Sequence, residues 1–242
     1  MLPIDLEILK YILFEKPLYA YKIRPYLRTV DYTELKIRLE NYQRDESLLT
    51  KDLSTAPFTI FDLETTGLLP EVGHEIISIG AIRIYGTQHI QYERFHQHIY
   101  PIRPVPKRTL ELTGISREDL KNGHSFCDAY YNFLEFSKDT ILVAYPAAFD
   151  MNFLQTMLKR WKLPVKTPYS VDAQSLVKQL YPNNKIQLDT IISDLGISKL
   201  ERHHALNDAT MTAELFQKLL QDCMDLGMET PGELINYAQK KS

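Results

Sequence analysis

Apolar and polar positions divide the chain near residue 52. Before that point the apolar positions follow a helical spacing in two stretches. These are Ile4, Leu6, Leu9, Ile12 and Leu13 in the first stretch, and Leu35, Ile37, Leu39 and Tyr42 in the second. Pro17 and Pro25 break the pattern between them. We therefore predict a small helical N-terminal appendage over residues 1–52, with residues 51–57 as the junction.

From Pro57 onward the pattern changes to short β-rich runs. Three runs follow one another, at Phe58–Leu63, Glu75–Tyr85 and Ile90–Ile99, and they predict an antiparallel meander. Later runs alternate between strand and helix character. Strands are predicted at Thr140–Tyr145 and Tyr169–Val171, and helices at Leu110–Leu112, Ser125–Phe136, Phe149–Trp161, Ala173–Leu180, Gln187–Leu195 and Ala205–Leu226.

This order of elements indicates an α/β fold with a mixed sheet flanked by helices. We place the main domain at residues 53–226 and a C-terminal tail at residues 227–242. Ser125 is expected to cap one helix, Gly196 to end another, and Asp172 and Asp189 to act as helix caps.

Chain length, net charge and cysteine spacing limit the classes of protein that fit this sequence. A chain of 242 residues suits one large domain with a small addition. The formal net charge is −3, so binding of a polyanion would need local cations or metal ions. Cys127 and Cys223 have no partner at zinc-ligand or disulfide-framework spacing. Neither a signal peptide nor an apolar stretch of about 20 residues is present, so we expect a reducing, cytoplasmic setting and no membrane partner.

Two acids stand at the end of an otherwise apolar strand. Residues 59–67 read T-I-F-D-L-E-T-T-G, and alternation along a strand puts Asp62 and Glu64 on the same side. Two ionised carboxylates roughly 6.6 Å apart repel one another, and a divalent cation with its preference for oxygen ligands would offset that repulsion. Acids at a strand end also simply face water or cap a turn, and for this pair alone that is the commoner outcome.

Two further acids stand at the boundaries of elements. Asp150 ends L-V-A-Y-P-A-A-F-D, in the first turn of a helix, where compensation of the helix dipole would explain it. Asp208 ends H-H-A-L-N-D, and His203 in the same stretch is a candidate general base because an unperturbed histidine has a pKa near 6.5. A surface histidine pair is the alternative. Taken together, these positions are ones that folding can bring to a single site.

The motifs together resemble the DEDD exonucleases of the histidine subgroup, the group of the epsilon proofreading subunit of bacterial DNA polymerase III. The resemblance covers roughly residues 57–222 and rests on four segments: F-D-L-E-T-T-G with H-E-I-I-S-I-G-A-I-R-I, then P-I-R-P-V-P-K-R-T-L-E-L-T-G-I-S, Y-S-V-D-A-Q-S-L-V-K-Q-L-Y-P, and H-H-A-L-N-D-A. It implies a ribonuclease H-like fold and 3′-5′ exonuclease activity that releases nucleoside 5′-monophosphates from DNA, in proofreading or repair.

The resemblance also implies the roles of the site residues. The four acids of the family fall on Asp62, Glu64, Asp150 and Asp208, which would bind two divalent ions, Mg²⁺ or Mn²⁺, and the general base falls on His203. His204 occupies a variable position and is expected to be a bystander or a substrate contact. One departure is plain: Tyr145 and Pro146 stand where the family usually has His-Asn, which puts substrate positioning and nucleic-acid preference in doubt.

Substrate contacts are expected next to the acids. Backbone N–H groups of Thr65, Thr66 and Gly67 would hold the terminal nucleotide. Phe149 would stack on a base, but its helical spacing suits burial in the core equally well, and we favour the core. Two basic groups are candidates for phosphate contacts, with solvated surface as the commoner alternative. They are Arg103, Lys107 and Arg108, and Lys159, Arg160, Lys162 and Lys166.

Rival functions stay open at this point. One is an RNA-directed 3′ exonuclease, and another is a nucleic-acid-binding accessory module with weak catalysis. The complete set of five catalytic residue types argues against the accessory module. The expected partners are single-stranded DNA 3′ ends, with RNA as an alternative, and a polymerase or repair protein. Residues 1–52 carry equal numbers of acidic and basic residues, so their charge gives no support for contact with nucleic acid.

Overall fold

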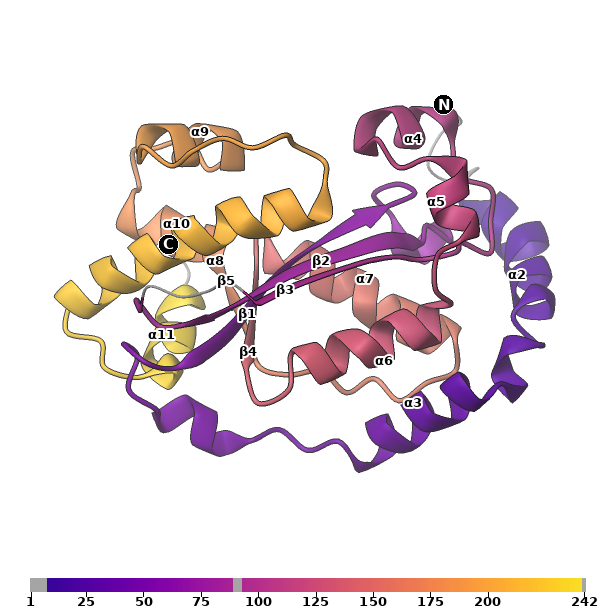
Figure 1. Ribbon diagram of the computed structural model, residues 1–242, viewed down its shortest axis with the longest axis horizontal. Coiled ribbons are helices and arrows are strands. Elements are labelled where there is room, and N and C mark those ends of the chain that lie inside the picture. Colours follow the sequence, from indigo (N-terminus) through magenta and orange to yellow (C-terminus); the bar gives the residue numbers. More distant parts are fainter. Residues whose placement is uncertain (1–7, 89–92, 241–242) are drawn as a thin grey trace.

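The computed structural model describes residues 8–88 and 93–240, which are built around a five-stranded sheet (Figure 1). Its strands lie in the order β3-β2-β1-β4-β5. They are β1 (Pro57–Thr65), β2 (Ile76–Tyr85), β3 (Glu93–His98), β4 (Ile141–Ala144) and β5 (Ser170–Asp172). The first three strands pair antiparallel, whereas β4 pairs parallel with β1 and β5 parallel with β4. The predicted mixed sheet and meander are therefore confirmed, and residues 90–92 of the third predicted strand lie outside the described residues.

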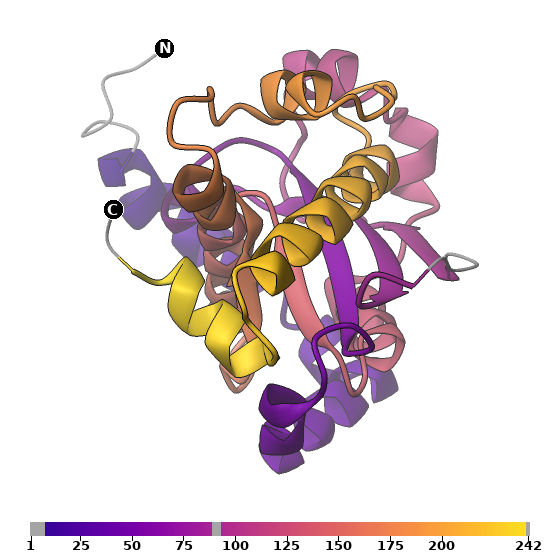
Figure 2. The same ribbon diagram turned by 90° about the vertical axis from the view of Figure 1, so that its left-hand side faces the viewer.

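Helices cover both faces of this sheet. The helical elements are η1 (a π-helical turn, Tyr11–Glu15), α2 (Lys16–Lys22), η2 (Tyr26–Arg28), α3 (Val30–Asn41), η3 (Glu46–Thr50), η4 (Pro70–Val72), α4 (Lys107–Thr113), α5 (Arg117–Lys121), α6 (Phe126–Phe136), α7 (Ala147–Arg160), α8 (Ala173–Leu180), α9 (Leu188–Asp194), α10 (Ala205–Asp225) and α11 (Pro231–Ala238). Figure 2 shows α10 crossing one face of the sheet diagonally. Within the described residues, no helix combines the length and apolar character that a bilayer crossing requires.

Alternation along β1 separates the two halves of the core. Phe61 and Leu63 pack with α6 and α7 on one face, while Phe58 and Ile60 pack with α10 on the other. Because side chains two apart share a face, the row that begins with Phe58 and Ile60 continues into Asp62 and Glu64. The face that buries α10 thus ends in carboxylates at the carboxyl end of β1.

The N-terminal helices pack onto the first of these core halves. Five of their side chains are buried in the same cluster as α6 and α7: Tyr19, Ile23, Tyr32, Leu35 and Leu39. The Trp161 indole N–H donates to the Tyr19 hydroxyl at 3.0 Å. The predicted break at Pro17 is wrong, because helical structure runs from residue 8 to residue 22. Pro17 is the second residue after the π-helical turn Tyr11–Glu15, at the junction where the hydrogen-bond pattern changes to that of α2.

Near the C-terminus, the structure contains a helix, α11, that the sequence analysis did not predict. Leu234 is fully buried, and α11 packs against β5, α8 and η3. Its start carries a capping box, in which Thr230 and Glu233 bond each other's backbone N–H groups. The division of the chain at residues 52 and 226 stays a prediction.

Candidate active site

The carboxylate row on β1 lies beside a glycine on β2. Asp62 pairs with Gly80, and Gly80 in turn pairs with His96 on β3. A Cβ atom on Gly80 would lie 2.2 Å from the backbone nitrogen of Leu206, in the first turn of α10. Glycine is therefore required here, because only the absence of a side chain lets α10 approach the sheet this closely. Sequence reasoning did not identify Gly80.

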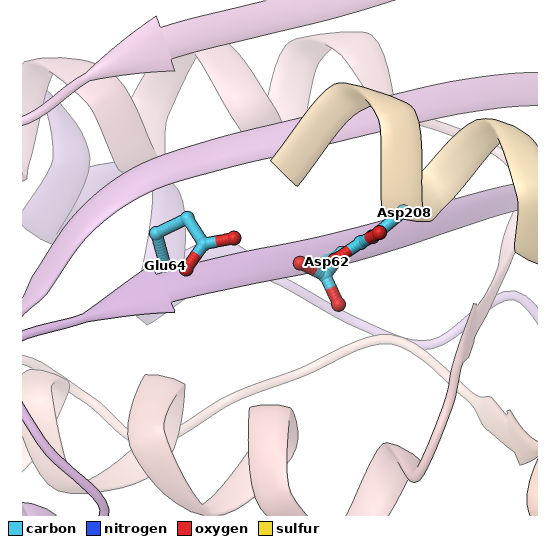
Figure 3. Close-up of side chains that lie close together, drawn as sticks. All are labelled: Asp62, Glu64 and Asp208. Atoms are coloured by element: carbon cyan, nitrogen blue, oxygen red, sulfur yellow. The ribbon is translucent and has the colours of Figure 1, made fainter. Parts of the chain in front are cut away.

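This close approach carries Asp208 to the β1 carboxylates. One carboxylate oxygen from each of Asp62, Glu64 and Asp208 lies within 4.8 Å of the others (Figure 3). Oxygen atoms that share one hard cation lie at most about 5 Å apart, twice a metal–oxygen distance of 2.0–2.6 Å. The donor set and its spacing therefore fit a divalent ion. Among the described residues, this is the single group of three or more acidic, histidine or cysteine side chains with such spacing.

The turn before α10 fixes both His203 and Asp208. His203 has φ = 62°, a left-handed conformation that is uncommon outside glycine and costs about 1 kcal/mol or more. In this conformation its backbone N–H donates to Oδ2 of Asp208 at 3.1 Å. The His203 side chain is exposed next to the buried Asp208. This hydrogen bond thus holds His203 beside Asp208, at the rim of the carboxylate cluster.

One cation faces the cluster from the same turn. Nη1 of Arg202 lies 2.6 Å from Oδ1 of Asp208, while its Nε contacts Asp189 at 3.3 Å. Oδ1 of Asp208 is buried, and this ion pair does not have the alignment of a hydrogen bond. A single guanidinium offsets only part of the negative charge that several carboxylates would carry, so the site has room for additional positive charge.

Burial and crowding disfavour ionisation of these carboxyl groups. Burial first and the Asp208 charge second raise the pKa of Glu64 to about 8, and Arg202 opposes this rise. Burial also raises the pKa of Asp62 well above its ordinary value, with further contributions from Asp150, Asp208 and Glu64. The pKa of Asp208 is likewise raised by burial, although Arg202 and the His203 N–H oppose the rise. A bound cation would reverse this situation by stabilising the ionised forms.

Asp150 lies at the edge of this group. It is 2% exposed in the first turn of α7, and burial raises its pKa well above the ordinary value, whereas hydrogen bonding to the backbone of Leu63 and of Asp150 itself lowers it. Its charge raises the pKa of Asp62, so the two side chains are close. Asp150 does not, however, belong to the trio whose oxygens lie within 4.8 Å of one another.

The predicted substrate residues adjoin Glu64 or Asp150 in the chain. They differ in how far their polar groups and rings already contact other parts of the protein. Thr66 is engaged within the protein, because its N–H donates to the Glu75 carbonyl and its hydroxyl accepts from the Glu75 N–H. The Thr65 hydroxyl donates to the Gly67 carbonyl at 2.8 Å. A Cβ on Gly67 would lie 2.5 Å from the His74 ring, so the glycine serves close packing. Phe149 is half-buried and packs on Phe153, with ring centroids 4.9 Å apart.

Histidines behind α10 form a support that the sequence did not predict. His204 is the N-cap of α10, and its Nδ1 accepts from the Asn207 N–H at 3.4 Å. Its ring centroid lies 4.8 Å from that of His96, which in turn lies 4.9 Å from that of His98. Burial first, and the neighbouring His98 and His204 second, lower the pKa of His96 to about 4. His96 is therefore neutral at pH 7, and its contact with His204 links β3 to the beginning of α10.

Two predicted helix caps and several predicted phosphate contacts can also be compared with the structure. Asp172 caps α8 as predicted, by accepting from the N–H groups of Gln174 and Ser175. The prediction that Asp189 caps a helix is wrong, since its carboxylate instead pairs with Lys199 and Arg202. Several cations proposed for phosphate contacts are used within the protein: Arg103 pairs with Glu15, Lys107 pairs with Glu111, Arg160 donates to the carbonyls of His74 and Pro70, and Lys166 donates to those of Glu40 and Tyr42.

Comparison with known protein families agrees with this geometry. A family model described as Exonuclease, of the RNase T type, matches residues 59–216. The matched range contains all four acids and His203.

Comparison with curated proteins found relatives of two kinds. A PolC-type DNA polymerase III of Thermotoga maritima is 36% identical over 180 residues, which are 74% of this chain but 13% of that protein. The chain thus spans a small part of such relatives. A DNA polymerase III subunit epsilon of Rickettsia conorii is 34% identical over 167 residues, which are 66% of this chain and 72% of that protein.

Solved structures share the fold. The nuclease domain of 3′hExo, described as a DEDDh family member bound to rAMP, matches with a TM-score of 0.63 at 20% identity, over 71% of this chain and 94% of that one. Exonuclease X in complex with 5′ overhanging duplex DNA matches with a TM-score of 0.57 at 18% identity, over 75% of this chain and 99% of that one. At these identities the match shows the ribonuclease H-like architecture of the sheet and its helices.

Proposed function

Because the chain belongs to the exonuclease family, we propose that it is a 3′-5′ exonuclease that releases nucleoside 5′-monophosphates from the 3′ end of DNA. One observation carries the proposal: carboxylates from β1 and α10, which are far apart in sequence, lie within 4.8 Å of one another, with His203 at their rim. This arrangement suits hydrolysis of a phosphodiester.

The exonuclease family is divalent-metal dependent, and this chain carries a carboxylate cluster that suits such an ion. We propose two ions, Mg²⁺ or Mn²⁺, with Asp62, Glu64 and Asp208 holding one and Asp62 and Asp150 holding the other. Such ions activate a water molecule and stabilise the leaving oxygen of the substrate. The role of Arg202 in the protein without metal is to offset part of the Asp208 charge.

We assign the general base to His203. Its ring is exposed, so it can reach a water molecule at the rim, and its backbone N–H already fixes it to Asp208. A positioned histidine typically contributes about 10²- to 10⁴-fold to such a step. Arg202 precedes it in the chain and pairs with Asp208, which restrains the same turn.

The terminal nucleotide would bind beside the end of β1. We propose that backbone groups of Thr65 and Gly67 contact it, whereas Thr66 acts through its bonds to Glu75, which hold the loop in place. Phe149 is half-buried, so one side of its ring remains available to a base while the other packs on Phe153.

The curated relatives support a proposal for the cellular setting of the activity. Since they are bacterial DNA polymerase III proteins, we propose that the chain works on single-stranded DNA 3′ ends alongside a polymerase, in proofreading or repair, in the cytoplasm. RNA 3′ ends are the alternative substrate.

The decisive experiment uses DNA and RNA oligonucleotides labelled at either end, with Mn²⁺, with Mg²⁺ and with chelator. The proposal predicts shortening from the 3′ end, release of 5′-monophosphates, a requirement for the ion, and faster degradation of DNA. The Asp208→Ala variant should bind oligonucleotides but release no product. Metal-independent turnover, or full activity of this variant, would refute the assignment.

A further inference from the structure

A basic cleft lies between the N-terminal helix α2 and helix α5. It has a volume of about 280 Å³ and is lined by Lys22, Tyr100, Pro101, Ile102, Arg103, Pro104, Val105, Arg117, Leu120 and Lys121. Four of these residues are cationic and none is acidic, although the chain as a whole carries a net charge of −3. The cleft is therefore a local concentration of positive charge on a slightly acidic protein.

The cations of the cleft differ in how far they are occupied within the protein. Arg103 is used, because it pairs with Glu15 and donates to the Val72 carbonyl. Lys22 makes a single long hydrogen bond of 3.4 Å, to the Ile102 carbonyl. Within residues 8–88 and 93–240, Arg117 and Lys121 make neither an ion pair nor a side-chain hydrogen bond, and both are exposed. Three cations thus remain available to a ligand.

Nearby acids do not cancel this charge inside the cleft. Glu118 and Asp119 lie on the same short helix, but neither lines the cleft. The Asp119 carboxylate accepts from the Ser116 N–H in a capping box, which fixes it at the start of α5. Tyr100 adds an aromatic ring that is 45% exposed at the cleft wall, which suits stacking on a base.

Hydrogen bonds tie the wall of the cleft to the end of the carboxylate strand. The buried Glu75 side chain accepts from the N–H groups of Ile102 and Arg103, at 3.2 and 2.8 Å. The Glu75 backbone is bonded to Thr66, two residues beyond Glu64, and Tyr19 of α2 donates to the same carboxylate. Figure 1 accordingly shows α2, α4 and α5 gathered at one end of the molecule. The cleft and the carboxylates share one rigid support.

We infer that this cleft binds the phosphate backbone of a single-stranded polynucleotide whose 3′ end lies at the carboxylates. Lys22, Arg117 and Lys121 contact phosphates, and Tyr100 stacks on a base. This inference rests on the proposed nuclease function and extends it, since it gives the N-terminal segment a part in holding the substrate. The cleft acts only on substrates long enough to reach it.

Substrate length and salt provide the test. We compare wild-type protein with the triple variant Lys22→Gln, Arg117→Gln, Lys121→Gln on single-stranded DNA of 3 and 16 nucleotides, over a range of salt concentrations. The matched control is Lys178→Gln, Lys185→Gln, Lys218→Gln, which removes three exposed lysines that do not line the cleft. Each phosphate contact on a single strand contributes about 0.7 to the slope of log affinity against log salt.

For the 16-mer, the slope of log kcat/KM against log salt should fall by about 2 in the cleft variant, together with a loss of the preference for the 16-mer over the 3-mer. Hydrolysis of the 3-mer and of a nitrophenyl ester of thymidine 5′-monophosphate should be unchanged, as should all values for the control. If the cleft variant keeps the wild-type slope and length preference, the inference is overturned. If wild-type protein hydrolyses neither the short substrates nor the 16-mer, the proposed function itself fails.

Discussion

Glu64→Gln should stabilise the protein in the absence of metal at pH 8, even though it removes a proposed metal ligand. Glu64 is 8% exposed, and burial with the Asp208 charge raises its pKa from the ordinary 4.5 to about 8. Because the folded-state pKa is above the unfolded-state value, the protonated carboxyl stabilises the folded protein at low pH. That contribution is lost as the pH rises from about 4.5 to about 8. The neutral amide avoids the loss.

The size of the effect follows from the same values. A rise from 4.5 to about 8 corresponds to at most roughly 5 kcal/mol, at about 1.4 kcal/mol per pH unit. Relaxation of the carboxylate toward solvent lowers this figure, and we expect about 2–5 kcal/mol. For a chain of this length, 1 kcal/mol shifts the melting temperature by about 2–4 °C.

The assay is thermal and urea unfolding in chelator at pH 5 and pH 8. The wild-type protein should lose stability relative to Glu64→Gln between these values, while Glu34→Gln, at an exposed position on α3, should follow the wild type. At saturating Mn²⁺ the order should invert, because the wild type then gains binding energy that the variant lacks. Parallel pH profiles for wild type and Glu64→Gln in chelator would refute the argument from buried charge.

Three further predictions concern the same site. His203→Ala should lower turnover by about 10²- to 10⁴-fold and keep oligonucleotide binding; an unchanged pH–rate profile would argue against a base. Gly80→Val should weaken both Mn²⁺ binding and folding, because its Cβ would lie 2.2 Å from the Leu206 nitrogen; calorimetric titration and melting check this, and wild-type affinity would contradict it. Mn²⁺ binding should release protons at pH 7 and tighten as the pH rises to about 8, since Glu64 with a pKa of about 8 is protonated in the metal-free protein. Calorimetry in buffers of different ionisation enthalpy measures this release, and zero release would count against it.

Much of the fold could be predicted because the local signals agree with one another. The β-rich runs with alternating positions identified β1 and β2, and the helix α8 has the predicted bounds, Ala173–Leu180. The break predicted at Pro17 is wrong because helical structure continues through this proline, next to a π-helical turn that the sequence pattern does not reveal. The helix α11 is short and lies near the chain end, so its pattern was too brief to separate from a tail.

The carboxylates were visible in the sequence, but their support was not. Asp62 and Glu64 are two residues apart on a strand, which alternation alone interprets. The Asp189–Arg202–Asp208 chain of ion pairs and the His96–His204 ring contact depend on the packing of α9, α10 and β3. The requirement for glycine at position 80 likewise depends on where α10 lies, and the isolated strand pattern reads the same with alanine there.

The most direct measurement is anomalous diffraction from crystals soaked in Mn²⁺. We expect an anomalous peak among the carboxylate oxygens of Asp62, Glu64 and Asp208, and loss of that peak in crystals of Asp208→Ala. A well-ordered soaked crystal with no peak among these side chains would contradict the claim that these carboxylates bind a divalent cation.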